Sequence, residues 1–460
     1  MDGERLSAGR GRVRSPQVRP TLVTVFALVA WTLVAAASGR GFGALPASAD
    51  PSPDDQIHYT LTGPDSVTFD WRGPDASISF GPDEHYGTTV QAVPPRAIPV
   101  DSAGPFWEAR LTSLTPDTTY HYLIDPVGQD GTFHTAPTGD FTFDAVADIS
   151  DTVTNPWVAV THAQIASDAP DLVLVGGDLS YANVNGPQAV RQFFDDIQAW
   201  SLSAPAQFAW GNHEYAKADQ NAPPGTPQDS MANYKGRIDL PNPQTVSTDT
   251  STRSTAPGCA LVGGVNPCQG EDWGWFESGN VCFVSYPEPW YNALTDWQEG
   301  ADAVMQGCQD DPDVAFIVTW GHRPAYSSVA VDTPQLTTVI NALADRFGPN
   351  APDGKYVLNI AGHIHGGEVF SPQHGVVHIT NGGGGEGETS YPQQLAQGSI
   401  FHTAHPEHLR VMVVGSTMTV SMICGPPYAP DPRDPCTQDA VLKTMTFTAG
   451  QSPVPVRTTR

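Results

Sequence analysis

Positive charge is scarce in this 460-residue chain, which has 22 lysines and arginines against 49 aspartates and glutamates and a formal net charge of −27. So acidic a protein repels nucleic acid and anionic membranes, and neither is an expected partner. It also repels phosphate at long range, so any phosphate chemistry would need strong positive charge at the site itself. The length is sufficient for two or three domains with substantial hydrophobic cores.

The N-terminal segment has the features of a secretory signal. Arginines precede the apolar run "TLVTVFALVAWTLVAAAS", which is followed by an Ala-x-Ala sequence ending at Ala49. We therefore expect residues 1–49 to be a signal peptide and the mature protein to be secreted. The alternative is an uncleaved membrane anchor, because the run approaches the length that a bilayer requires. The segment has no adjacent pair of arginines, so a twin-arginine route is not supported. Its loss removes six arginines and two acidic residues, and the formal charge goes from −27 to −31.

Cysteine is rare, and all six cysteines lie outside the predicted signal. An even number of cysteines in an exported chain is typical of disulfide bonds. Six cysteines allow many pairings, and the sequence does not decide among them. Because short loops close most readily, we expect the pairs Cys259–Cys268, Cys282–Cys308 and Cys424–Cys436.

The first part of the mature chain has the pattern of a β-sandwich. After a Pro- and Asp-rich linker at residues 50–56, residues 57–138 contain short strands of alternating polarity, such as "SVTFDWRG" and "ASISFG", separated by Gly, Pro and Asp turns. This pattern predicts an antiparallel β-sandwich. The stretch "LTSLTPDTTYHYLI" is similar to a corner of a fibronectin type III domain, with an ordinary hairpin as the alternative.

Residues 139–450 have a different pattern, and residues 451–460 form a short tail. Apolar runs such as "DLVLVGGD" and "VAFIVTWGH" imply strands buried on both faces, and longer segments between them can be helical, so we expect an α/β domain. In "TDWQEGADAVMQ" a capping box from Thr295 to Gln298 predicts a helix start. Residues 216–272 are polar and predict a long surface loop. The stretch "NGGGGEGE" is a turn, not a phosphate loop, because no Lys-Ser or Lys-Thr follows it.

The apolar runs end in residues that can bind metal ions. Carboxyl ends of strands gather ligands in open α/β sheets, so these residues can converge although they are far apart in the sequence. Taken singly, each has an ordinary explanation as a turn, cap or core residue. Five such stretches at successive strand ends are improbable by chance. The residues are Asp148, Asp178, Tyr181, Asn212, His213, His322, His363 and His365.

This set of donors indicates two hard or borderline metal ions. It contains carboxylates, an amide, a phenol and imidazoles but no thiolate, which argues against a structural cysteine zinc site. The histidines of "GHIHG" can each face a different ion. Asp178 is the natural bridge between ions about 3.5 to 4 Å apart.

The order of these motifs resembles the metallophosphoesterase superfamily, whose pattern is D-x-[HG], GD, GNH[DE], H and GHxH. The tyrosine in "GDLSY" and the absence of histidine from "DIS" make the chain similar to the purple acid phosphatases. That resemblance implies a fibronectin type III-like domain, followed by a metallophosphoesterase domain in which a sandwich of β-sheets is flanked by helices.

The resemblance also implies roles for individual residues. One ion would be held by Asp148, Asp178, Tyr181 and His365, and the other by Asp178, Asn212, His322 and His363. The tyrosinate favours Fe³⁺ in the first site, and the second would hold a divalent zinc, iron or manganese ion. His213 would hydrogen-bond the phosphate or the leaving group, as the catalytic and substrate-binding histidine.

Two positions depart from the family pattern. Ser150 replaces the usual glycine, which leaves the geometry of that turn open. No second outer histidine follows "HRPAYSS", because Val329, Ala330 and Val331 stand there. Arg323 or Tyr326 is expected to help bind phosphate instead.

Together these features predict a secreted acid phosphatase that hydrolyses small phosphate monoesters by attack of a metal-activated water. The alternatives are a phosphodiesterase, a nucleotide or polyphosphate hydrolase, or a secreted binding protein with a non-catalytic metal site. No nucleic-acid partner is expected, and no membrane after signal cleavage. The sequence leaves the oligomeric state open.

Overall fold

The structure is a computed structural model. It describes residues 54–124, 130–215, 230–246, 258–259, 262–329, 333–387, 389–425 and 436–453. The predicted signal peptide lies outside the described residues, as does most of the predicted tail. Among the described residues, no helix is long and apolar enough to cross a membrane. Residues 50–460 form one compact unit.

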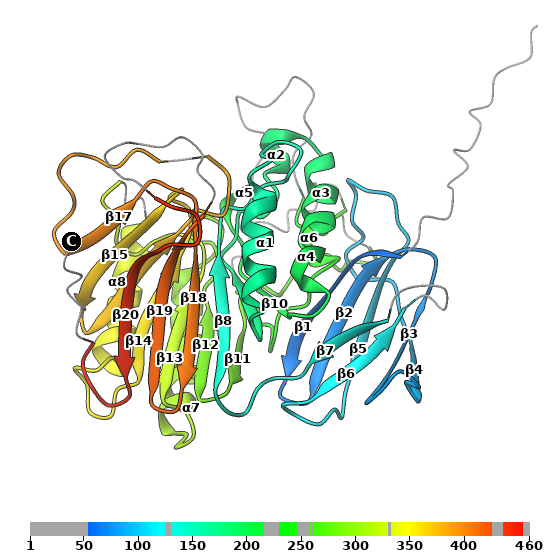
Figure 1. Ribbon diagram of the computed structural model, residues 1–460, viewed down its shortest axis with the longest axis horizontal. Helices are drawn as coiled ribbons and strands as arrows, with labels where there is room; N and C mark the ends of the chain where they lie inside the picture. Colours follow the sequence, from blue (N-terminus) through cyan, green and yellow to red (C-terminus); the bar gives the residue numbers. More distant parts are fainter. Residues whose placement is uncertain are drawn as a thin grey trace, which may run out of the picture. The chain divides into compact units, whose positions relative to one another are not determined.

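The first part of this unit is an antiparallel β-sandwich, shown in blue and cyan in Figure 1. The sheets pack through aromatic side chains, with the ring centroid of Phe69 4.8 Å from that of Tyr122 and 5.3 Å from that of Phe133. Strand β1 begins at Asp55, two residues before the predicted boundary at residue 57. One sheet has the order β1 (Asp55–Gly63), β2 (Ser66–Arg72), β5 (Phe106–Leu111), and the other β4 (Thr88–Gln91), β3 (Ser77–Gly81), β6 (Thr119–Leu123), β7 (Gly131–His134).

The rest of the chain forms two larger mixed sheets, as expected for an α/β domain. The six-stranded sheet has the order β10 (Ala206–Phe208), β9 (Leu172–Val175), β8 (Phe141–Val146), β18 (Glu407–Val414), β19 (Thr417–Cys424), β20 (Val441–Thr448). The seven-stranded sheet has the order β11 (Trp275–Ser278), β12 (Val281–Ser285), β13 (Phe316–Trp320), β14 (Tyr356–Ala361), β16 (Val376–Asn381), β15 (Gly367–Gln373), β17 (Ser399–Thr403).

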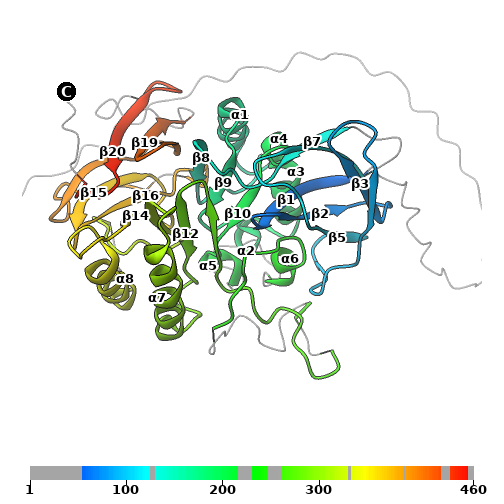
Figure 2. The ribbon, with the colours of Figure 1, turned by 90° about the horizontal axis from the view of Figure 1, so that it is seen from below.

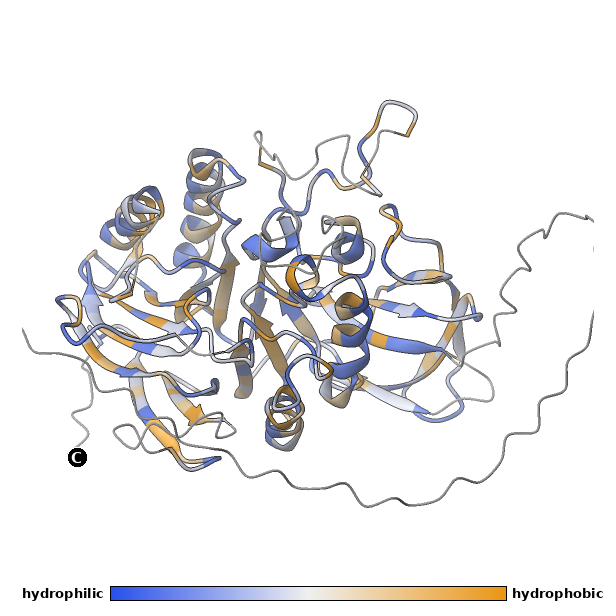
Figure 3. Cartoon of the chain, turned by 90° about the horizontal axis from the view of Figure 1, so that it is seen from above, coloured by the Kyte–Doolittle hydropathy of each residue, from blue (hydrophilic) through white to orange (hydrophobic). Residues whose placement is uncertain are grey.

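The two sheets pack face to face and helices cover their outer faces (Figure 2). Phe143 of β8 meets Phe283 of β12 at a ring-centroid distance of 5.2 Å, and hydrophobic residues gather on these strands (Figure 3). Burial on both faces explains the continuous apolar runs. The first sheet is covered by α1 (Val158–Asp168), α3 (Gln188–Asp196) and α4 (Gln198–Ser201), the second by α7 (Leu294–Asp310) and α8 (Pro334–Phe347); α2 (Ala182–Asn185), α5 (Asn212–Tyr215) and α6 (Ala232–Lys235) are single turns.

Two local predictions were wrong. Helix α7 begins at Leu294 with Ala293 at its N-cap, so the capping box from Thr295 does not form, and the Thr295 hydroxyl lies 3.4 Å from Oδ1 of Asp296. The part of the predicted surface loop that the structure describes is not all exposed. Met231 and Tyr234 around α6 are buried in the core beneath the first sheet's helices, because apolar residues are interspersed in that polar stretch.

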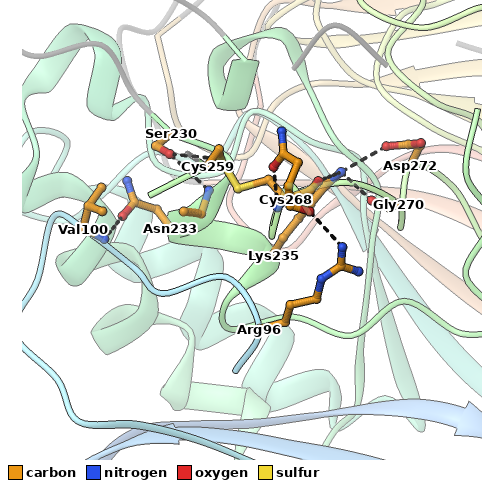
Figure 4. Close-up of a disulfide and its surroundings, with 11 residues drawn as sticks. Arg96, Val100, Ser230, Asn233, Lys235, Cys259, Cys268, Gly270 and Asp272 are labelled. Carbon is orange, nitrogen blue, oxygen red and sulfur yellow. Dashed lines mark hydrogen bonds and ion pairs between the residues drawn. A yellow bond between two sulfur atoms is a disulfide. The ribbon is translucent and has the colours of Figure 1, made fainter. Parts of the chain in front are cut away.

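The three predicted disulfides are confirmed: Cys259–Cys268, Cys282–Cys308 and Cys424–Cys436. Figure 4 shows the first of them beside the buried ammonium group of Lys235. That group donates to the carbonyl oxygens of Cys268 and Gly270 at 3.1 and 2.6 Å and to Oδ1 of Asp272 at 3.0 Å. The buried cation thus ties the stretch from Cys268 to Asp272 to α6, and the disulfide ties Cys268 to Cys259.

The direction of the strands decides where a site can form. Strands β8, β9 and β10 run parallel, and β13 and β14 run parallel in the other sheet. Val146 pairs with Val175, and Trp320 pairs with Ile360, so the carboxyl ends are aligned within each sheet. All the predicted ligands follow these five ends.

Candidate metal centre

The loops after the five strands hold several predicted ligands in a conformation that is unusual for residues with side chains. Asp148, Asp178, Tyr181 and His363 have φ angles of 57°, 51°, 54° and 71°. The left-handed region is uncommon outside glycine, and residues held in it are concentrated at functional sites. The surrounding packing therefore keeps these side chains turned inward at some cost in stability.

Two glycines allow the backbone to approach Asp148 closely. A Cβ atom on Gly362 would lie 2.6 Å from Oδ2 of Asp148, and one on Gly382 would lie 2.8 Å from the same oxygen. The same oxygen accepts a hydrogen bond of 2.7 Å from the backbone N–H of His363. Asp148, on the first sheet, is thus tied to the loop after β14 of the second sheet.

Four side chains converge on one side of the centre. The Nε2 atom of His322 lies 3.0 Å from Oδ2 of Asp178 and 3.1 Å from Oδ1 of Asn212. Nδ1 of His363 lies 3.2 Å from the same nitrogen. The other ring nitrogen of His322 is 3.0 Å from the carbonyl oxygen of Gly176, which fixes the ring with Nε2 facing the group.

A second group lies on the other side. The hydroxyl of Tyr181 donates to Oδ1 of Asp148 at 2.9 Å and lies 3.0 Å from Nε2 of His365. Nε2 of His365 is 3.5 Å from the same carboxylate oxygen. Asp148 and Tyr181 are fully buried, so three potential ligand atoms meet in a small, largely desolvated space.

Asp178 belongs to the first group and also affects the second through its charge. One of its oxygens lies beside His322, and the other accepts a 2.7 Å hydrogen bond from the backbone N–H of His213. In the second group, burial and Asp148 raise the pKa of Tyr181 most, and the charge of Asp178 adds to the rise. Burial would lower the pKa of His365, but Asp148 and, less strongly, Asp178 raise it. The residue expected to bridge two ions therefore contacts one set of donors and acts on the other through its charge.

The electrostatics of the cluster favour positive charge. Burial alone would lower the pKa of His322, but Asp178 and Asp148 raise it to about 10. Burial would likewise raise the pKa of Asp178, yet His322 and His213 hold it well below its usual range. An imidazole this buried normally loses its proton, so the raised pKa reports a strongly negative local potential.

The surroundings of Tyr181 favour its neutral, protonated form over the charged phenolate. Burial, together with the charges of Asp148 and Asp178, raises the pKa of its phenol well above the usual value. The hydroxyl keeps its proton under these conditions. A strongly Lewis-acidic cation would be needed to replace that proton, so the position suits a highly charged ion.

His213 lies beside the centre and is held by Asn183. Its Nδ1 is 2.7 Å from Oδ1 of Asn183, and its ring centroid is 4.3 Å from that of Tyr181. Nε2 lies 3.8 Å from Oδ2 of Asp178. Because Oδ1 of Asn183 can only accept, Nδ1 carries the proton, and Nε2 faces the centre.

Arg323 also reaches the centre, whereas Tyr326 does not. The guanidinium of Arg323 lies 2.9 Å from Nε2 of His363 and donates to Oδ1 of Asn212 at 3.1 Å. Tyr326 instead donates to Asn341 on α8 at 2.8 Å and packs against a histidine of β16. Of these two residues, only Arg323 contacts the predicted metal ligands.

Sequence reasoning missed the residues that hold the ligands in place. The buried carboxylate of Glu214 accepts hydrogen bonds from the backbone N–H groups of Asp178, Leu179 and Gly211 at 2.7 to 3.0 Å, which joins the loops after β9 and β10. Glu288 accepts from Nε of Arg323 at 2.6 Å. The position of Glu214 directly after "GNH" was the one local signal for it.

Ser150 adopts the conformation that the usual glycine would adopt. Its φ is 72°, and its backbone N–H donates to the carbonyl oxygen of Leu179 at 2.9 Å. Its hydroxyl lies 3.3 Å from the side-chain nitrogens of Asn155 and Asn185. These hydrogen bonds offset part of the cost of the left-handed conformation, so the turn accommodates a serine.

The donors present fit two metal ions. Each group combines anionic oxygen and imidazole nitrogen, the donors that iron, zinc and manganese accept. Among the described residues, Asp178, His322 and His363 also form a cluster whose ligand atoms all lie within 4.8 Å of one another.

Comparison with known proteins decides the family. The family model described as calcineurin-like phosphoesterase matches residues 140–367, which hold every predicted ligand. Residues 140–367 are a calcineurin-like phosphoesterase domain. The chain is therefore a hydrolase of the metallophosphoesterase superfamily, and its resemblance to purple acid phosphatases is confirmed by curated relatives.

Two plant relatives and two solved structures illustrate the likeness of this calcineurin-like phosphoesterase. Probable purple acid phosphatase 20 of Arabidopsis thaliana is 24% identical over 396 residues, covering 80% of this chain and 83% of that protein. Purple acid phosphatase 22 of the same plant is 24% identical over 325 residues, covering 65% and 70%. Purple acid phosphatase PPD1 from yellow lupin (Lupinus luteus) seeds superposes with a TM-score of 0.63 at 16% identity, covering 86% of this chain and 74% of that one. PhoD superposes with a TM-score of 0.60 at 12% identity, covering 91% and 94%. The structural matches show a common fold.

Proposed function

We propose that this calcineurin-like phosphoesterase is a secreted acid phosphatase that hydrolyses phosphate monoesters at a centre of two metal ions. The observation that carries the proposal is the convergence of two groups of ligands, with Asp178 3.0 Å from His322 in one and Tyr181 2.9 Å from Asp148 in the other. We infer that Asp178 serves both groups. A single buried carboxylate shared by two such groups is the arrangement that a pair of ions requires.

The ligands divide into two sets. Asp148, Asp178, Tyr181 and His365 would hold one ion, and Asp178, Asn212, His322 and His363 the other. A pair of ions at this centre supplies Lewis acidity, which acidifies a water and neutralises charge on the phosphoryl group. The phenol of Tyr181 is a hard donor once it is ionised, which favours Fe³⁺ in the first set. The second set suits divalent zinc, iron or manganese.

The chain's own side chains would bind and orient the substrate. His213, held by Asn183, presents Nε2 toward the centre and can hydrogen-bond a phosphate oxygen or the leaving oxygen. Arg323 adds a permanent positive charge that the acidic body of the protein lacks. Its bond to Glu288 leaves the two terminal nitrogens directed toward Asn212 and His363. We infer that both residues contact the bound phosphate.

The domain organisation and secretion belong to the same proposal. Residues 57–138 would be a fibronectin type III-like domain after a short linker, and residues 139–450 the metallophosphoesterase domain before a short tail. Three disulfides suit an oxidising compartment, which agrees with a signal peptide at residues 1–49.

Parallel assays with p-nitrophenyl phosphate and bis-p-nitrophenyl phosphate, together with metal analysis, test the proposal. A phosphatase of the proposed type hydrolyses the monoester much faster and contains two metal ions per chain. Preference for the diester would indicate a phosphodiesterase. Metal without hydrolysis of either compound would indicate a binding protein.

A further inference from the structure

A cavity of about 610 Å³ opens at the carboxyl edge of the seven-stranded sheet, next to the candidate metal centre. It lies where α7 and α8 begin, because both helices follow strands of that sheet. Cavities of this size are typical of sites for small organic molecules, which range from about 300 to 1,000 Å³. Its lining includes Trp290, Asn292, Gln298, Thr333, Gln335 and Thr338.

One side chain connects this cavity to the metal centre. The guanidinium of Arg323 donates to Oδ1 of Asn212 at 3.1 Å, and the same guanidinium lies 3.7 Å from the centroid of the Trp290 ring. Trp290 is 58% exposed and lines the cavity. A molecule whose phosphate lies at Arg323 would therefore extend across the indole of Trp290 into the cavity.

The lining is polar but uncharged. Amide and hydroxyl side chains come from both helices, and none of the described residues that line the cavity carries a charge, although the chain has a net charge of −27. Asp296 in the first turn of α7 adds negative charge nearby. Because the lining has no positive charge and a carboxylate lies nearby, the cavity disfavours a further phosphate group on the substrate. It suits a neutral group that forms hydrogen bonds.

We propose that this cavity binds the leaving group of the substrate, and that the leaving group is an uncharged alcohol that carries a ring, such as a nucleoside or a sugar. Its ring stacks on Trp290, and its hydroxyl or amide groups bond the polar lining. The inference rests on the proposed phosphatase function and adds the substrate class to it.

Filling the cavity from a position remote from the metal centre tests the proposal. Thr338 is an exposed lining residue on α8, and Thr338→Trp would occupy the space that the ring needs. Ala342→Trp is the matched control, because Ala342 is exposed one turn further along α8 and does not line the cavity. Gln298→Trp fills the cavity from α7 and serves as a second variant if the first does not fold.

The substrates are adenosine 5′-monophosphate, glucose 6-phosphate and the ringless glycerol 3-phosphate. We expect Thr338→Trp to lower kcat/KM for at least one ring-bearing ester about tenfold or more and to leave glycerol 3-phosphate within about twofold. Ala342→Trp should change none of them. Equal effects on all three esters, or no effect on any, would overturn the subsite.

Direct binding separates this inference from the proposed function. Isothermal titration with adenosine and with glucose measures the subsite without hydrolysis and shows which kind of ring it accepts. We expect the wild type and Ala342→Trp to bind one of them and Thr338→Trp to bind it about tenfold more weakly. Binding without hydrolysis of any ester would contradict the phosphatase but support the subsite. Hydrolysis without binding of either compound would contradict the subsite alone.

Discussion

Nε2 of His322 lies 3.0 Å from Oδ2 of Asp178, although the two residues follow strands of different sheets. This contact joins the carboxyl edges of the two sheets at the point where both groups of donors meet. The fold therefore brings buried charged groups of both sheets into one small volume, and the surrounding residues hold them there.

The first prediction concerns the shared carboxylate. Asp178→Asn should reduce hydrolysis by about a hundredfold or more and lower the metal content, because one anionic ligand serves both ions. Asp313→Asn, at an exposed turn, is the control and should change neither quantity. Phosphatase assays and metal analysis on the same preparations check this. An Asp178→Asn protein with both ions and normal turnover would exclude the two-metal assignment.

The second prediction concerns colour and Tyr181. A phenolate bound to Fe³⁺ should give a broad visible absorption band, and Tyr181→Phe should remove that band without unfolding the protein. Activity should fall less than in Asp178→Asn, because Asp148, Asp178 and His365 remain as ligands. Visible spectra recorded beside iron analysis test this. An oxidised protein with stoichiometric iron and no colour would show that Tyr181 is not a ligand.

The third prediction concerns the positioning of His213 by Asn183. Asn183→Ala should lower kcat about tenfold at unchanged metal content, because Nε2 of His213 is no longer directed at the centre. Added to His213→Ala, the same change should have little further effect, since the two act as one unit. Independent, multiplying effects in this double-mutant cycle would contradict the positioning role.

The fourth prediction concerns stability and pH. Burial, more than the nearby charge of Asp148, raises the pKa of Glu407 to about 8. Since the folded pKa lies above the unfolded value, this group contributes stability at acid pH that is lost as the pH rises toward 8. Glu407→Gln should therefore equal the wild type near pH 4 and exceed it at pH 8 by an amount on the order of 2 to 4 kcal/mol.

Urea unfolding at both pH values measures this difference. Glu299→Gln, on the exposed side of α7, is the control and should follow the wild type. A Glu407→Gln protein whose stability runs parallel to that of the wild type over this range would mean that Glu407 is ionised in the folded state.

The α/β architecture and the convergence of the expected ligands could be predicted because both depend on local patterns. Apolar runs mark buried strands, and Asp148, Asp178 and His322 each follow such a run directly. The parallel direction of the strands then brings their carboxyl ends together. The three disulfides follow from short separations in the sequence.

The supporting contacts could not be predicted, because they depend on how distant loops meet. Asn183 and Glu288 stand in unremarkable stretches, and only the folded chain brings them to His213 and Arg323. Tyr326 shows the reverse case. It is close to His322 in the sequence, but its side chain turns toward α8.

The central claim, a centre of two ions that hydrolyses phosphate esters, is tested most directly by measuring metal content and p-nitrophenyl phosphate turnover during chelation and reconstitution. Two metal ions per chain should be present, turnover should disappear as they are removed, and it should return only when the second equivalent is restored. Full turnover by protein with one ion, or with none, would contradict the account.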